Sequence, residues 1–65
     1  MRNHLKNIEE LTYLINKYCD GRLKNELLDT VKNHFAPKYI FYNLSDSNMT
    51  KEDKKIYHKI IGDYI

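Results

Sequence analysis

Apolar residues recur every three or four positions through the first third of the chain, from Leu5 to Cys19. Such steps place apolar side chains on one stripe of a helix with 3.6 residues per turn. The polar residues between them, Asn7 among them, fall on the opposite face. The pattern predicts an amphipathic helix over about residues 3–19, with Asn3 as its N-cap. Its apolar stripe consists of Leu5, Ile8, Leu11, Leu14, Ile15, Tyr18 and Cys19.

A second helical repeat follows after a short break at Asp20-Gly21. Glycine adopts the left-handed conformation that ends a helix without steric cost, so the first helix is predicted to end there. The second helix is predicted over residues 22–35. It should stop near Phe35, because Pro37 lacks a backbone N–H and disfavours helix at the residue before it. So short a break favours an antiparallel helical hairpin.

The segment 38–44 admits more than one interpretation. Its aromatic and β-branched residues are typical of a strand. No second strand pattern exists in the sequence, and a lone strand would leave its backbone groups unpaired. We therefore expect a short helix or an extended strap across the hairpin, with intermolecular β pairing as a further alternative. Turn-forming residues follow at 43–48.

The last helix should begin after Thr50. Thr50 followed by Asp53 resembles a capping box, with Asp in place of Glu. Glu52 and Asp53 place negative charge in the first turn, where the helix dipole favours it, and both are expected at the solvated surface. The apolar face of this helix consists of Ile56, Ile60, Ile61, Tyr64 and Ile65.

Together these patterns predict an all-α fold in a single small domain over residues 1–65. A helical hairpin over 3–35 is joined by a C-terminal helix over 50–65, and 38–44 forms a short helix or strap. A chain of 65 residues buries only roughly 60% of the surface that it exposes when unfolded, so the core is thin. Small domains of this kind often depend on a partner or on self-association.

Composition and charge exclude several environments for the chain. The formal net charge is only +2, with acidic and basic residues interleaved, so no strong field favours nucleic acid or membrane. No apolar run approaches the length of a membrane span or a signal peptide. The single cysteine, Cys19, is expected to be a small buried hydrophobe rather than a reactive thiol or an intermolecular bridge. These features predict a cytoplasmic protein.

No catalytic or metal-binding pattern stands out. The three histidines, His4, His34 and His58, have no ligand-like spacing, so neither a metal nor another cofactor is expected. Nothing pairs Cys19 with a histidine, and the two glycines do not form a phosphate-binding loop. Carboxylates adjacent in sequence point in different directions on a helix. We therefore expect a protein that is not an enzyme.

The six tyrosines are the most informative residues, since they exceed what a thin core can hide. Tyr18 and Tyr64 fit apolar helix faces and are expected in the core. Tyrosine is enriched at protein interfaces, because its ring is buried there while its hydroxyl finds a partner. The sequence thus predicts a protein-binding module, with a phage- or mobile-element-encoded inhibitor or regulator of a host protein as the specific hypothesis. The predicted partner-binding residues are Tyr39, Phe41, Tyr42, Tyr57, Lys51, Lys55 and Lys59.

Two alternative functions stay open. Lys51, Lys55 and Lys59 recur at steps of four and form a basic helix face, which in a nucleic-acid-binding regulator would contact phosphates. Glu52 and Asp53 partly offset this charge, which favours an ordinary solvated face. The second alternative is a structural homo-oligomer, possible because the core is thin. Abundant Lys, Asn, Ile and Tyr, which have A/T-rich codons, indicate an A/T-rich genome.

Overall fold

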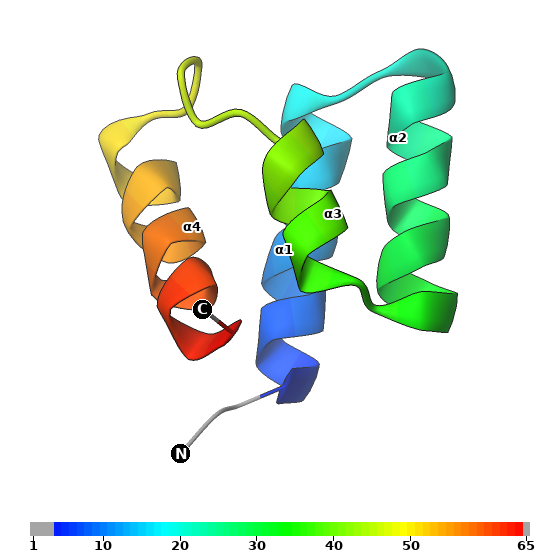
Figure 1. Ribbon diagram of the computed structural model, residues 1–65. Helices are drawn as coiled ribbons and strands as arrows, with labels where there is room; N and C mark the ends of the chain where they lie inside the picture. The colour runs from blue at the N-terminus through cyan, green and yellow to red at the C-terminus, as the bar shows by residue number, and fades with distance from the viewer. Residues whose placement is uncertain (1–3, 65) are drawn as a thin grey trace.

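The computed structural model describes residues 4–64, and the regular structure within that range is entirely helical (Figure 1). The predicted all-α class is confirmed, although four α-helices replace the three that the apolar pattern delineated most clearly. The predicted cap Asn3 and the apolar residue Ile65 lie outside the described residues. The elements are α1 (His4–Tyr18), α2 (Gly21–Asp29), a π-helical turn η1 (Thr30–His34), α3 (Pro37–Asn43) and α4 (Lys51–Tyr64).

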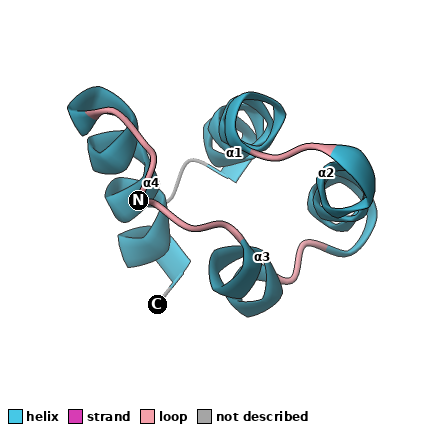
Figure 2. Cartoon of the chain, turned by 90° about the horizontal axis from the view of Figure 1, so that it is seen from above, coloured by secondary structure: helices cyan, strands magenta, loops and turns pink. Residues whose placement is uncertain are grey.

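The helices form a bundle in which α2 and α4 lie on opposite sides, with α1 and α3 between them (Figure 2). α1 packs against α2, η1 and α4, and α3 packs against α4. α1 and α4 run antiparallel, so the start of α4 lies beside the end of α1 (Figure 1). This arrangement brings together side chains that are 35 to 40 positions apart in the sequence.

The predicted hairpin of the first two helices is confirmed, and its turn depends on Gly21. Gly21 has a φ of +61°, a left-handed conformation that residues with a β-carbon rarely adopt. Asp20 precedes it in an extended conformation. The backbone therefore reverses direction within a few residues, and α2 packs back against α1.

The second helix stops where Pro37 predicts, but its last turn is wider than an α-helical turn. The Phe35 N–H donates to the Thr30 carbonyl at 2.6 Å, the five-residue step of a π-helix. Phe35 itself has a φ of +31°, uncommon for a residue with a side chain. Its ring lies 4.7 Å from the His4 ring and 4.9 Å from the Tyr64 ring, centroid to centroid. These contacts hold the chain in its left-handed turn.

The ambiguous segment 38–44 forms most of the short helix α3. Pro37 occupies the first turn, where its missing N–H would have no helical partner in any case. Ile40 and Leu44, four positions apart, are both buried on the inner side of this helix. The short helix is therefore the observed form, and the strap and the strand alternatives for this segment are wrong.

The core draws residues from every helix, but two predictions about α1 are wrong. Leu5 is 76% exposed, because it lies about 120° around the helix from Leu11, on a side left open to solvent. Asn7 was expected on the polar face and is only 1% exposed, because the end of α4 covers it. The buried apolar residues are Leu11, Leu14, Ile15, Leu27, Val31, Ile40, Leu44, Met49, Tyr57 and Ile60.

Leu14→Ala is expected to lower the free energy of unfolding by roughly 2–5 kcal/mol, because it empties a fully buried position. In so small a domain that loss approaches the whole stability. Leu5→Ala makes the same chemical change at an exposed position and should alter stability by less than about 0.5 kcal/mol. Urea unfolding followed by circular dichroism measures both, and equal destabilisation by the two substitutions would contradict the observed burial.

Candidate functional site

The structure separates the four predicted aromatic contact residues into two pairs. Tyr42 is 89% exposed and Tyr39 is 44% exposed, so both present their rings to solvent. Phe41 is half-buried against the core. Tyr57 is only 3% exposed and therefore cannot contribute to a surface. The prediction that Tyr57 binds a partner is thus wrong.

Tyr57 instead attaches α3 to α4. Its hydroxyl donates to the backbone carbonyls of Leu44 and Phe41, the latter at 3.2 Å. Its ring meets the Phe41 ring edge to face at a centroid distance of 5.7 Å. Burial raises the pKa of Tyr57 to about 12, so the hydroxyl keeps its proton for these bonds. The signal in the sequence was the helical spacing of Tyr57 from Ile60, three positions on along the same face.

Tyr39 and Tyr42 form what we call the aromatic face. They are three positions apart on α3, so they lie on neighbouring parts of its outer surface. The Tyr39 hydroxyl donates to Oε2 of Glu26 on α2 at 3.4 Å, which turns this ring toward α2. Tyr42 has no side-chain partner within residues 4–64. In the aromatic face the Tyr39 ring is therefore held by a hydrogen bond, and the Tyr42 ring is not.

Lys51, Lys55 and Lys59 form what we call the lysine face of α4. All three are exposed, and none has an ion pair or hydrogen bond with a described side chain. The neighbouring His58 lies 2.7 Å from Asp46 through its Nε2 atom. The hydrogen bond to His58 lowers the pKa of Asp46. The lysine face thus carries three unpaired positive charges in one row.

The structure does not bring the aromatic face and the lysine face together. Tyr39 leans toward α2 through Glu26, whereas the lysines lie on α4, on the opposite side of the bundle from α2 (Figure 2). The single surface predicted to combine tyrosines with lysines is therefore two surfaces. Each has to be considered with its own partner.

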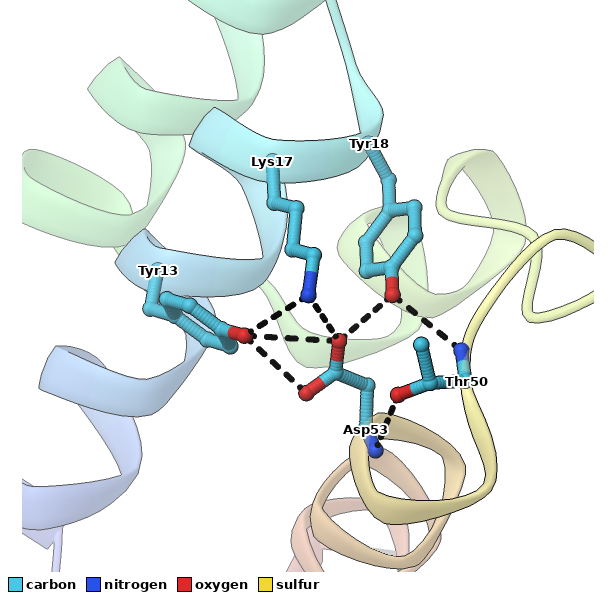
Figure 3. Close-up of polar contacts among 5 residues, drawn as sticks. All are labelled: Tyr13, Lys17, Tyr18, Thr50 and Asp53. Carbon is cyan, nitrogen blue, oxygen red and sulfur yellow. Dashed lines mark hydrogen bonds and ion pairs between the residues drawn. The ribbon is translucent and has the colours of Figure 1, made fainter.

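A polar cluster that the sequence did not reveal joins α1 to α4. Tyr13, Lys17 and Tyr18 of α1 all reach the carboxylate of Asp53 near the start of α4 (Figure 3). Asp53 is 4% exposed, so the expectation that it lies at the solvated surface is wrong. We call these residues, together with Thr50, the Asp53 cluster.

The geometry of the Asp53 cluster satisfies both carboxylate oxygens. Lys17 Nζ lies 2.9 Å from Oδ2, and the Tyr18 hydroxyl donates to the same oxygen. The Tyr13 hydroxyl donates to Oδ1 at 3.2 Å and accepts from Lys17 Nζ at 3.1 Å. A buried charge is stable only when it is paired and hydrogen-bonded, and this one has both kinds of partner. No sequence periodicity signals it, because the donors come from another helix.

The cluster also completes the N-terminus of α4. The Asp53 N–H donates to Thr50 Oγ1 at 3.1 Å, which confirms the predicted capping role of Thr50. In a capping box the second residue's carboxylate would accept from the cap's own N–H. Here the Thr50 N–H donates to the Tyr18 hydroxyl at 3.2 Å instead. Tyr18 thereby frees the Asp53 carboxylate to face α1.

The charges within the cluster stabilise each other. The hydrogen bond from Tyr18, then that from Lys17, lowers the pKa of Asp53 to about 2. The hydrogen bonds with Tyr13 and Asp53 raise the pKa of Lys17 well above its ordinary value. Both groups therefore stay ionised across the physiological range.

A second polar contact joins the opposite ends of the same two helices. The buried Asn7 amide donates to Asp63 Oδ2 at 2.9 Å. His4 Nδ1 lies 2.7 Å from the Tyr64 hydroxyl, and the Phe35 ring packs on both. Tyr64 was predicted to lie in the core, and it is half-buried. α1 and α4 are thus pinned near both ends.

The described chain, residues 4–64, contains no detectable pocket and no group of three His, Cys, Asp or Glu side chains placed to hold a metal ion. Within the same range no helix combines the length and the apolarity needed to cross a membrane. Cys19 is half-buried, and burial raises the pKa of its thiol. The candidate sites are therefore the two exposed faces.

Comparison with known protein families, curated proteins and solved structures finds no match to this chain.

Tyr18→Phe is expected to lower the free energy of unfolding by about 1–3 kcal/mol, because it removes one donor from the buried Asp53 carboxylate and leaves the Thr50 N–H without its partner. Tyr42→Phe removes an exposed hydroxyl and is the matched control, with a change below about 0.5 kcal/mol. Chemical denaturation measures both. If Tyr18→Phe were as stable as Tyr42→Phe, the cluster would not join the helices.

Stability is expected to fall with acid through Asp53. Its pKa is about 2 in the folded chain against 3.8 as the ordinary value, so the stabilisation is fully present above the ordinary value and is lost as the pH falls through 2. Thermal unfolding measured across this range should show a steeper decline for the wild type than for Asp53→Asn, which is less stable at neutral pH. Glu9→Gln is the charge-matched control and should follow the wild type. Parallel curves for the wild type and Asp53→Asn would contradict the assignment.

Proposed function

We propose that this chain is a small protein-binding module whose contact surface is the aromatic face of α3. The observation that carries the proposal is the 89% exposure of Tyr42 on a helix that is fixed from below. A free ring on a fixed helix loses little conformational freedom on binding, and its burial against a partner removes a large apolar area from water.

The fixation of α3 supports this role. Ile40 and Leu44 anchor its inner side in the core. The Tyr57 hydroxyl donates to two backbone carbonyls at the end of α3. Phe41 packs on the Tyr57 ring. The four aromatic residues predicted to bind a partner therefore have two roles. Phe41 and Tyr57 hold α3 in place, and Tyr39 and Tyr42 are exposed on its outer surface.

The contacts of Tyr13 and Tyr18 support the choice of Tyr42 as the binding residue. Tyr13 is 45% exposed, but its hydroxyl belongs to the Asp53 cluster. Tyr18 is half-buried and fully engaged in the same cluster. Tyr42 is thus the ring that the fold itself does not use. Aromatic residues of this kind act as anchors at the centre of protein interfaces.

We further propose that the partner is a host protein and that the chain acts on it in the cytoplasm as an inhibitor or regulator. The composition supports an A/T-rich genome, such as that of a low-GC bacterium or its phage, as the source. The mechanism is occupation of a partner surface, with no chemical step. A second copy of the chain is the alternative partner for the same face.

A photo-reactive phenylalanine analogue placed at position 42 should form a discrete crosslinked product in cells of the native host. The same analogue at Leu5, which is exposed on another helix, is the matched control and should not. Excess wild-type protein should suppress the product in lysate, whereas the Tyr42→Ala protein should suppress it at least about tenfold less well, as expected for loss of a hot spot.

The mass of the product identifies the partner class. A product of twice the chain's mass identifies a second copy, and sedimentation of the purified protein would then show a dimer that Tyr42→Ala dissociates. Equal crosslinking from positions 42 and 5, or none from either, would refute a binding role for the aromatic face.

A further inference from the structure

The lysine face of α4 is a regular row of charge. Lys51, Lys55 and Lys59 follow one another at steps of four residues, which corresponds to a rise of about 6 Å per step along the helix. All three are exposed and unpaired within the described chain. The row therefore presents three ammonium groups to one side of the molecule.

The fold removes the charge that would have neutralised this row. In the sequence, Glu52 and Asp53 are close enough to offset the lysines, but Asp53 is buried and paired with Lys17 of α1. Asp46 is hydrogen-bonded to His58, and this contact is an ion pair when the ring is protonated. Glu52 is exposed and forms no ion pair with a described residue. The face is therefore more basic than the net charge of +2 suggests.

The row opposes helix stability rather than serving it. Like charges four positions apart repel each other on a helix surface, and Lys51 lies at the positive end of the helix dipole. Glutamate at position 51, in the first turn, would have supported the helix better. A surface that is unfavourable for the isolated chain but regular in its spacing is typical of a binding surface for an anion.

The surroundings of the row indicate which anion. The large apolar side chains exposed in residues 4–64 are Leu5, Tyr13, Leu23, Tyr39 and Tyr42, and none of these belongs to α4. A protein interface needs an apolar centre, which the lysine face lacks. A phosphodiester backbone needs only positioned cations.

We propose that the lysine face binds the phosphate backbone of a nucleic-acid duplex. The face holds no Arg, Asn or Gln that could read base edges, and His58 is engaged by Asp46. Binding therefore depends mainly on charge, and a duplex of any base sequence should bind. It lies on a different face from the proposed protein contact, so the protein has two separate binding surfaces.

The test is fluorescence anisotropy of a short labelled DNA duplex of mixed sequence, titrated with the purified full chain at several KCl concentrations. Three phosphate contacts predict a slope of about −2.7 for log K against log salt, and hence a roughly 40-fold loss of affinity between about 50 and 200 mM. The variant with Lys51, Lys55 and Lys59 all changed to Gln should bind at least about tenfold more weakly at the lower salt and lose most of the slope.

The matched control changes Lys24, Lys32 and Lys38 to Gln, which removes the same charge from α2, η1 and α3. It should retain affinity within about threefold, since its lysines lie off the row. Circular dichroism checks that both variants stay helical, as Lys→Gln changes at exposed positions and at the half-buried Lys24 should permit. Tyr42→Ala should bind DNA as the wild type does, so failure of the protein-binding proposal would leave this result unchanged.

Three outcomes would overturn the proposal. The first is no binding at about 50 mM salt. The second is equal loss of affinity in the two triple variants, which would indicate a general charge effect. The third is displacement of the duplex by poly-glutamate as efficiently as by unlabelled DNA at equal charge, which would assign the face to an acidic protein surface instead.

Discussion

The buried carboxylate of Asp53 is the contact on which the arrangement of α1 and α4 depends. Its three donors all come from the last turn and a half of α1, and its own backbone N–H is held by Thr50. A carboxylate removed from water is stable only while such partners remain in place. The two helices therefore have one favourable register, and a thin core is supplemented by directional bonds at its edge.

At the opposite end, α1 and α4 are also joined by side-chain hydrogen bonds, but these do not include a buried ion pair. Asn7 bonds Asp63, and His4 bonds Tyr64. The Phe35 ring closes this end and holds its own backbone in a left-handed turn. Polar and aromatic contacts at both ends thus align α1 with α4 where a domain of this size has few apolar side chains to do so.

These structural contacts decide which residues stay at the surface. The Asp53 cluster uses Tyr13, Tyr18 and Lys17, and the α3–α4 contact uses Tyr57. Tyr42 is left exposed as a consequence. The same pairing with α1 that stabilises Asp53 in the interior also removes a negative charge from the solvent side of α4, so its lysines face less opposing charge. One interaction in the interior therefore shapes both proposed binding surfaces.

The sequence by itself determined the all-α class, the positions of the two hairpin helices and the last helix, and the residues where helices begin or end, Gly21, Pro37 and Thr50. These features depend on local backbone preference and on apolar spacing within one helix, which a chain carries at every point. It also indicated which of these residues lie at the surface, since Tyr39, Tyr42 and the row of lysines are exposed as the sequence predicted.

Only the tertiary structure decided which neighbour covers each helix face. Periodicity defines directions around one helix but not the identity of the helix opposite. Leu5 is therefore exposed and Asn7 and Asp53 are buried, against expectation, and Tyr57 faces a backbone instead of a partner. The donors to Asp53 lie 35 to 40 positions away, so only the folded chain brings them together, and only its geometry separates the tyrosines from the lysines.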